Sequence, residues 1–408
     1  MSMQRGSFLL GAFSGIAVVA NADHLFARAL AAAPLSGLPG AENRTLVLVN
    51  LQGGNDGLNC VVPHGNAAYY RVRPQLAIAR SEVLAIDAQM GFNPNMRALK
   101  ALYDKGQVAV VQGVGYPDPD HSHFRSTEIW QTAAPDKYLH TGWLGRYMDE
   151  AGLPADNLFN GVAISQVLPE AMIGTTVDVP AIPQERGYGL VSDRDAQTKG
   201  AYTRVVRDGR LPFKSPYLSH VMEIADHSQR GSEELPKLIA GYKPAGAYPA
   251  TPLGRSLSLA AQIVGSKLGT KVIYVQHGSF DTHVSQLQTQ NRLLAEFSDA
   301  IAAFYGDLAA HGNDGGVLTM TFSEFGRRIE ENGSRGTDHG EASPLFLIGG
   351  GVKGGLYGTA PDLARTSIGN VAYSTDFRSV YATVLEKWLG RPSQKILSGA
   401  FPTLSVLG

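Results

Sequence analysis

The chain has 408 residues, of which 44% are hydrophobic, and its 35 basic and 36 acidic residues leave a net charge of −1. This length and apolar content can build a large core, in one big α/β domain or two smaller ones, and they exclude a disordered chain. Because the charges nearly cancel, the chain lacks the basic balance that nucleic acid or an acidic membrane surface selects, and we expect neither as a partner.

The N-terminus predicts an export signal. Arg5 precedes an apolar stretch at 8–20 that is too short to span a bilayer, and small residues at 29–34 offer a cleavage site. We therefore exclude residues 1–35 from the fold and expect a periplasmic or secreted protein with no stable membrane span after signal removal. The alternative is a buried N-terminal helix. RGSFL resembles a twin-arginine (Tat) signal, but Gly6 replaces the second arginine, so the Tat and Sec routes both stay open.

Apolar runs of strand length alternate with helical patterns along the rest of the chain. The stripe from Leu287 to Leu308 predicts a long helix over 283–311. Strands alternating with helices predict a mainly parallel sheet covered on both faces, in one domain over 40–408. A polar, weakly periodic segment at about 175–250 predicts a cap or insertion. The predicted strands are 45–51, 108–115, 271–278, 317–322 and 344–350, and the further helices are 93–103, 124–133, 252–268 and 376–389.

Polar residues suited to catalysis adjoin each of these strands. In open α/β sheets the site lies beyond the carboxyl ends of the strands, so residues that follow the runs are the first candidates. In chain order the candidates are Asp56, then His121, Ser122 and His123, then Asp281 and His283, then Glu324, and finally Asp338 and His339 just before the last run.

Each candidate also has an ordinary structural role to offer. Asp56 in GGNDG could bond to its own turn, and Asp281 or Ser122 could cap the helix that follows. Glu324 could pair with Arg327 or Arg328. Capping and turn formation do not require carboxylates and imidazoles at nearly every strand, however, so their joint placement favours a metal site.

The residue types indicate which metal such a site would hold. Cys60 is the only cysteine, so a disulfide within the chain and a thiolate cluster are both excluded. Carboxylates and imidazoles suit a divalent ion, with Zn²⁺ or Mn²⁺ favoured and Mg²⁺ or Ca²⁺ possible. Two ions about 4 Å apart would suit phosphoryl or sulfuryl transfer. The metal and the N-terminus of a helix would then both assist Ser122 as a nucleophile.

Long motifs give the chain a resemblance to a known family. Among them are LVLVNLQGGNDGLNCVVP, DPDHSHFRSTEIWQTA, QHGSFDTH and TFSEFGRRIEENGSRGTDHGEASPLFLIGGGVKGGLYG, and the resemblance extends over about residues 43–390. They resemble the bacterial family catalogued as domain of unknown function 1501, which is similar to the alkaline phosphatase and sulfatase superfamily. The resemblance implies a three-layer α/β sandwich with a mainly parallel sheet and a metal site at the strand ends.

The superfamily's ligands can be carried over in part. The resemblance implies metal ligands at Asp56, Asp281, His283, Glu324 and His339, with Asp338 a further ligand or a group that orients His339. Asp281 and His283 are separated by one residue, where the superfamily's pair has three between them. Phe325 stands where the superfamily has a histidine, so one imidazole is missing.

Two functions follow as expectations. The first is an exported metal-dependent hydrolase of phosphate or sulfate esters, acting on a small molecule or a glycan. Its nucleophile would be Ser122 or a hydroxide held by the metal, with His121 and His123 as proton donors or further ligands. The alternative is a catalytically degenerate member that binds an anionic envelope component or assists cell-surface assembly.

Overall fold

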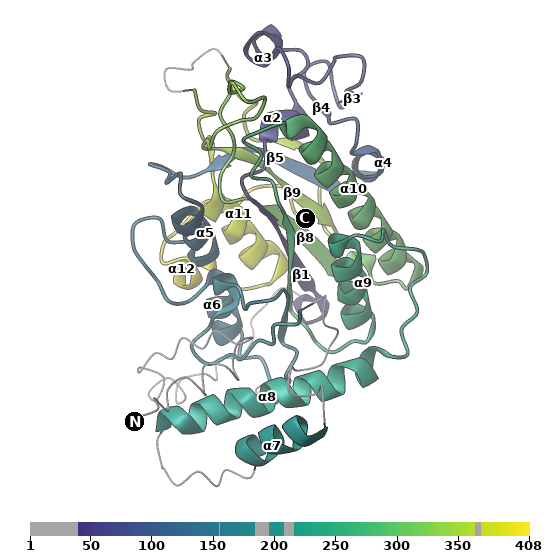
Figure 1. Ribbon diagram of the computed structural model, residues 1–408, viewed down its shortest axis with the longest axis vertical. Helices are drawn as coiled ribbons and strands as arrows, with labels where there is room; N and C mark the ends of the chain where they lie inside the picture. The colour runs from purple at the N-terminus through teal and green to yellow at the C-terminus, as the bar shows by residue number, and fades with distance from the viewer. Residues whose placement is uncertain (1–39, 155, 184–195, 208–215, 364–368) are drawn as a thin grey trace, which may run out of the picture.

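The computed structural model describes residues 40–154, 156–183, 196–207, 216–363 and 369–408 (Figure 1). The predicted export signal at 1–35 lies outside these residues. No helix in the part of the chain that is described has both the length and the apolar character needed to cross a membrane.

The main sheet runs through the middle of the molecule in the order β10-β5-β9-β8-β1-β7-β6, with β11 pairing with β5. Its strands are β1 (Thr45–Gln52), β5 (Val108–Gly115), β6 (Gly161–Ile164), β7 (Val272–Gly278), β8 (Val317–Phe322), β9 (Ser343–Gly349), β10 (Gly355–Tyr357) and β11 (Thr375–Asp376). A small antiparallel sheet holds β2 (Val61–Val62), β3 (Leu84–Ala85) and β4 (Gly91–Phe92).

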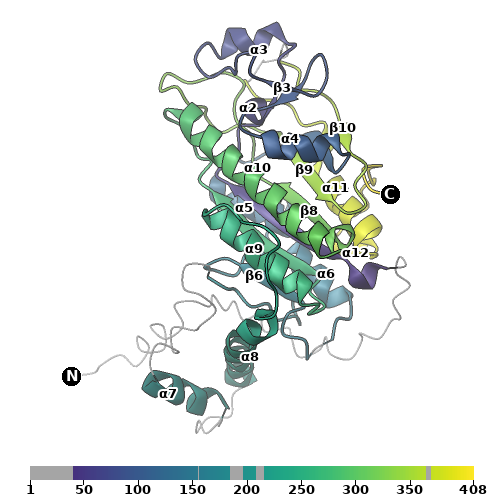
Figure 2. The same ribbon diagram turned by 90° about the vertical axis from the view of Figure 1, so that its right-hand side faces the viewer.

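Helices cover both faces of the main sheet, as the alternating pattern predicted. α9 and α10 lie on one face and α5, α6, α11 and α12 on the other (Figure 1), while Figure 2 looks onto the α4, α9 and α10 side. The fold is therefore the expected α/β sandwich. The helices are α2 (Gly57–Cys60), α3 (Ala67–Val72), α4 (Arg97–Asp104), α5 (His123–Thr132), α6 (Trp143–Glu150), α7 (Ala196–Arg207), α8 (Pro216–Ile239), α9 (Pro252–Gly265), α10 (Gln286–Ala310), α11 (Phe377–Thr383) and α12 (Ser393–Ile396). Short 3₁₀ turns occupy Ala41–Asn43, Glu170–Met172 and Asp314–Gly316, and a π-helical turn, Val384–Trp388, continues α11.

The central strand β1 is buried on both faces of the sheet, which explains its apolar sequence. Val47 and Val49 belong to the core under α10, whereas Leu46 and Leu48 belong to the core under α6 and α11. Successive side chains of a strand point to opposite faces, so a strand covered on both sides needs an uninterrupted apolar run. Each fully buried aliphatic side chain of this kind contributes about 1.5–3 kcal/mol of transfer free energy.

The last long strand, β9, runs against its neighbours. It pairs antiparallel with both β5 and β8, while β1 pairs parallel with β7 and β8. The residues that precede β9 therefore lie at the edge where β1, β7 and β8 end. This reversal brings the loop upstream of β9 to the same edge as the loops downstream of the other strands.

The segment predicted as a cap at about 175–250 contains α7 and α8. Both helices lie beyond the amino ends of the main strands, at the opposite end of the molecule from α2 and the strand ends (Figures 1 and 2). Leu235 and Ile239 of α8 join the core on the α9 side of the sheet.

Candidate metal centre

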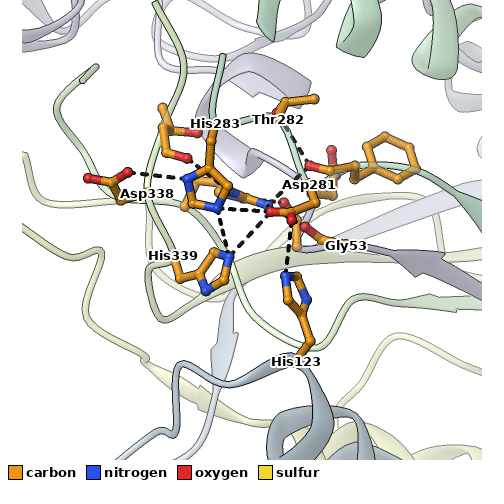
Figure 3. A network of polar contacts seen from close by, with 12 residues as sticks. Gly53, His123, Asp281, Thr282, His283, Asp338 and His339 are labelled. Atoms are coloured by element: carbon orange, nitrogen blue, oxygen red, sulfur yellow. Dashed lines mark hydrogen bonds and ion pairs between the residues drawn. The ribbon is translucent and has the colours of Figure 1, made fainter. Parts of the chain in front are cut away.

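Side chains from two loops and one helix meet at the carboxyl edge of the sheet. Asp281 and His283 follow β7, Glu324 follows β8, His339 precedes β9, and His123 is the first residue of α5. Figure 3 shows His123, Asp281, His283 and His339 pointing toward one another. The sheet thus brings together residues up to 216 positions apart, counted from 123 to 339.

The polar atoms of these four side chains are separated by short distances. His283 Nε2 lies 2.9 Å from His339 Nε2 and 3.0 Å from Asp281 Oδ1. Asp281 Oδ1 is 3.3 Å from His339 Nε2, and Asp281 Oδ2 is 3.4 Å from His123 Nε2. His123, Asp281 and His339 each offer a ligand atom within 4.8 Å of the others. Among the described residues this is a candidate His/Asp metal site, and His283 borders two members of that trio.

The outer nitrogen of each imidazole has its own oxygen partner. His123 Nδ1 is 2.8 Å from Glu324 Oε1, and His283 Nδ1 is 3.2 Å from Asp338 Oδ1. His339 Nδ1 is 2.7 Å from the backbone carbonyl of His121. An oxygen that only accepts places the proton on Nδ1 and leaves Nε2 with a free lone pair. This is the arrangement that orients metal-binding histidines in proteins.

His123 provides a direct test of whether these residues suit a cation. Its Nε2 is buried and has no hydrogen-bond partner among the described residues. An unpartnered buried nitrogen costs free energy unless something absent from the polypeptide binds it. Ligand atoms around one ion, each bound at about 2.1 Å, lie roughly 3 to 3.5 Å from their neighbours. The donor set and its spacing therefore fit a divalent metal ion.

Arg327 anchors the cluster from beneath. Its side chain is fully buried, and its Nη2 donates to Asp281 Oδ1 at 2.7 Å. The same guanidinium also donates to backbone carbonyls of three loops, at Gly53, Gly54, Phe280 and Thr337, and its Nη1 lies 3.4 Å from His283 Nε2. Arg327 thus fixes the loops after β1 and β7 and the loop before β9 relative to one another, and brings a permanent positive charge to the site.

The GGNDG loop after β1 requires glycine for two separate contacts. Gly53 and Gly54 both have positive φ. A Cβ at Gly53 would lie 2.5 Å from the backbone nitrogen of Asp281, and one at Gly54 would lie 2.3 Å from the ring of Phe325. Only glycine permits this approach, which brings the N–H of Gly53 to Glu324 Oε1 at 2.8 Å.

Phe325 fills the position where the superfamily resemblance implied a histidine. Its ring is buried and packs against the imidazoles of His339 and His123, with centroids 4.4 and 4.9 Å away. An apolar ring here offers no ligand atom, so it shapes the cluster by packing.

Local charges shift the pKa values within the cluster. Burial alone would raise the pKa of Asp281, but the hydrogen bond and charge of Arg327 outweigh it and lower that pKa to about 2. The hydrogen bond to Glu324 raises the pKa of His123. Burial lowers the pKa of His339, and the charge of Arg327 acts in the same direction. Asp281 is therefore ionised and His339 is held neutral at physiological pH, the protonation states that metal binding needs.

Other predicted site residues lie around the four at the centre. Glu324 and Asp338 contact imidazoles through Nδ1, on the side away from the shared centre. His121 contributes its carbonyl. Ser122 is exposed at the N-cap position of α5, and its side chain makes no capping hydrogen bond. Ser122 thus occupies the predicted N-cap position without the predicted side-chain hydrogen bond, and it directly precedes His123.

Asp56 lies apart from the cluster. Its Oδ2 accepts from Arg73 Nη1 and from Gln286 Nε2, both at 2.5 Å, and its Oδ1 accepts from Leu58 N as the N-cap of α2. Asp56 and Arg73 are both fully buried. Of the two roles predicted for Asp56, the structure supports the turn and capping role and does not bring the carboxylate to the four central side chains.

Two other structural roles offered by the sequence, for Asp281 and Glu324, are wrong. α10 starts at Gln286, three residues later than predicted, after Ser285 in the left-handed region, so Asp281 does not cap it. The helix starts late because the N–H groups of Ser285 and Gln286 donate to the carbonyls of Ser334 and Arg335. Glu324 pairs with His123 instead of with Arg327 or Arg328.

Residues with no sequence signal complete the support of the site. Thr337 Oγ1 donates to Gln286 Oε1, which links the loop carrying His339 to the buried Asp56 and Arg73 pair. The sequence showed Arg327 only as a cation close to Glu324 in the chain. Its buried hydrogen bonds could not be predicted, because they form only when three loops come together in the fold. Arg73 lies in a short helix-to-loop segment that carries no recognisable motif.

The chain belongs to the family described as "Protein of unknown function (DUF1501)", whose model matches residues 112–395. The family predicted from the motifs is confirmed, and the matched span begins later than the resemblance at 43. No curated protein matches the sequence.

Several solved structures are distantly similar to this chain. The C-terminal periplasmic domain of EcEptC from Escherichia coli, in complex with Zn, shares 12% identity over 75% of this chain and 73% of that one, with a TM-score of 0.34. The sulfatase PsFucS1 from Pseudoalteromonas sp. shares 11% identity over 90% of this chain and 72% of that one, with a TM-score of 0.34. The alkaline phosphatase of the Antarctic bacterium TAB5 shares 12% identity over 77% of this chain and 94% of that one, with a TM-score of 0.33. These likenesses are distant, and the function below is argued from the side chains of the site.

Proposed function

We propose that the protein is a metal-dependent hydrolase of phosphate or sulfate esters. The observation that carries this proposal is the convergence of three imidazole Nε2 atoms on the Asp281 carboxylate, with each Nδ1 held by an oxygen. Two loops and a helix carry the converging side chains, and 44% of the Asp281 side chain remains open to solvent. A structural metal site would be closed, whereas an exposed ligand leaves room for a substrate.

The proposed ligands are His123, Asp281, His283 and His339. Glu324 and Asp338 orient His123 and His283 through their Nδ1 atoms. Three nitrogens and a carboxylate favour Zn²⁺ or Mn²⁺ over Mg²⁺ or Ca²⁺. Cys60 cannot contribute, because burial raises the pKa of its thiol to about 12.

The residues of the chain provide a setting for an anionic ester. A bound divalent ion would polarise the ester and acidify a hydroxyl or a water. Arg327 adds a fixed positive charge next to Asp281, and its donors are already bonded, so it acts through its field. The N-terminus of α5 begins at His123 and favours a negative charge nearby. Ser122, exposed at that terminus, is the proposed nucleophile, with water as the competing one.

The test combines metal content with turnover. Protein purified without chelator is analysed by plasma emission and assayed with an aryl phosphate and an aryl sulfate. We expect bound metal and hydrolysis of one ester in the wild type, and loss of both in Asp281→Asn and His339→Ala. Ser122→Ala should lose hydrolysis and keep the metal if Ser122 is the nucleophile. Bound metal with no hydrolysis of either ester would instead support the degenerate binding protein.

We also propose that the protein acts after export, on the basis of residues 1–35 of the sequence. Fusing those residues to a reporter that is active only outside the cytoplasm tests this. We expect activity of the fusion, and replacement of Arg5 together with interruption of the apolar stretch at 8–20 should abolish it. A silent wild-type fusion would contradict export.

A further inference from the structure

Two buried arginines pair with carboxylates at this edge of the sheet, one with Asp56 and one with the proposed ligand Asp281. Asp56 is paired with Arg73 at 2.5 Å, and Asp281 with Arg327 at 2.7 Å. Both guanidinium groups are fully buried, so neither can leave without exposing an unpaired charge. These contacts give the edge of the sheet two permanent cations that belong to the protein.

The carboxylates of Asp56 and Glu324 are held by further protein groups. Glu324 Oε1 accepts from Gly53 N and faces His123 Nδ1, and Glu324 Oε2 lies 3.5 Å from Ser323 Oγ. Asp56 Oδ2 accepts a second bond, from Gln286. Asp56 and Glu324 are thus each held by fixed protein groups, Asp56 by a buried guanidinium and Glu324 by a backbone N–H and an imidazole.

Phe325 occupies a position at which the superfamily resemblance implied a histidine ligand. Its ring packs against His123 and His339 and lies close to the backbone of Gly54. No nitrogen or oxygen can bind a metal from this position. The unpartnered Nε2 of His123 and the facing Nε2 atoms of His283 and His339 therefore all belong to one centre.

We propose that this site holds one divalent ion, and that Arg73 and Arg327 supply the positive charge that a second ion would otherwise bring. This inference rests on the proposed function, since it concerns the same site. In this proposal the positive charge of Arg327 lies beside the ligand Asp281. Arg73 neutralises the buried carboxylate of Asp56.

The first experiment counts ions without using activity. Apoprotein is titrated with Mn²⁺ alone, and bound Mn²⁺ is followed by electron paramagnetic resonance together with elemental analysis. We expect saturation at one ion per chain, with the resolved hyperfine lines of an isolated Mn²⁺. Two ions about 4 Å apart would be magnetically coupled and would broaden those lines. Saturation at two ions with a coupled signal overturns the single-ion inference and leaves the proposed function standing.

A double variant then tests the assignment of Asp56 and Arg73. Asp56→Asn with Arg73→Met removes both charges of the buried pair together. We expect the Mn²⁺ ratio and signal of the wild type, because neither residue is a ligand, whereas His283→Ala should weaken Mn²⁺ binding at least tenfold. Loss of Mn²⁺ from a folded double variant would overturn the assignment. The wild-type titration decides the ion count even if this variant does not fold, and a wild type that binds no Mn²⁺, Zn²⁺, Mg²⁺ or Ca²⁺ overturns both proposals.

Discussion

The Nε2 atoms of His283 and His339 lie 2.9 Å apart, while Asp338 and the carbonyl of His121 accept from the opposite nitrogens of the two rings. Two imidazoles arranged in this way direct lone pairs at each other. Such a contact is repulsive unless a cation lies between the rings, whether a proton in the metal-free chain or a metal ion in the loaded one.

Metal removal should therefore destabilise the protein. We expect a chelator to lower the thermal midpoint of the wild type, and added Zn²⁺ to restore it, because an ion at 100 times its Kd stabilises the folded state by about 2.7 kcal/mol. His339→Ala should show no chelator effect in differential scanning calorimetry. His311→Gln is the matched control, since His311 follows the far end of α10, and it should keep the effect. An unchanged wild-type midpoint in chelator would contradict the metal site.

Glu324→Gln should weaken metal binding without abolishing it. The carboxylate orients His123 through Nδ1 and is the largest cause of that residue's raised pKa. Loss of such an orienting group typically costs 10–100-fold in metal affinity. Isothermal titration with Zn²⁺ measures the change, and Glu330→Gln, at an exposed side chain in the same loop, should bind as the wild type does. Equal affinities for the two variants would remove the orienting role of Glu324.

The buried pair of Asp56 and Arg73 should show strong energetic coupling. Arg73→Met leaves Asp56 buried without its cation, and we expect a loss of about 3–5 kcal/mol in the free energy of unfolding. The double variant Asp56→Asn/Arg73→Met removes both charges, so it should lose less than the sum of the two single variants. Urea unfolding of all four proteins gives the coupling. Strictly additive losses would mean that the pair contributes no specific interaction.

Glu170 should make stability depend on pH. Burial, followed by repulsion from Glu128, raises the pKa of Glu170 from 4.5 to about 7. A raised folded-state pKa means that this contribution to stability is complete below the unfolded value near 4.5 and is lost as the pH rises through about 7. Glu170→Gln should therefore be more stable than the wild type at pH 8, by about 1 kcal/mol after allowance for solvent screening, and equal to it near pH 4. Melting curves across this range check the sign. A constant difference between the two proteins would refute the pKa shift as its cause.

The sequence predicted the main strands and helices well because their signals are local. Each of the five apolar runs became a strand of the main sheet, and the stripe through Phe297 and Ile301 became α10. Periodicity reports burial, and burial of one face is what stabilises these elements. The late start of α10 was not predictable from it, because the N–H groups of Ser285 and Gln286 bond to a loop about 50 residues further along the chain.

The role of each candidate residue depended on pairings that no local pattern reveals. Asp56 occurs in a motif that suited a ligand, yet Arg73 and Gln286 reach it from other parts of the chain. His123 was predicted as a catalytic group, with ligation open, and only the structure shows its Nε2 without a partner. The direction of β9 is equally non-local, since a strand of the same sequence could run either way in the sheet.

The reversed direction of β9 has a consequence for how this family can diversify. β8 and β9 are antiparallel neighbours, so the 20 residues from 323 to 342 leave the sheet and return to it side by side. A loop anchored in this way can lengthen, shorten or be exchanged without disturbing the register of any strand. It carries Glu324, Arg327 and His339, so replacing this one loop by that of a relative would change one ligand, the buried cation and the group that orients His123. His123, Asp281 and His283 would stay in place on the scaffold.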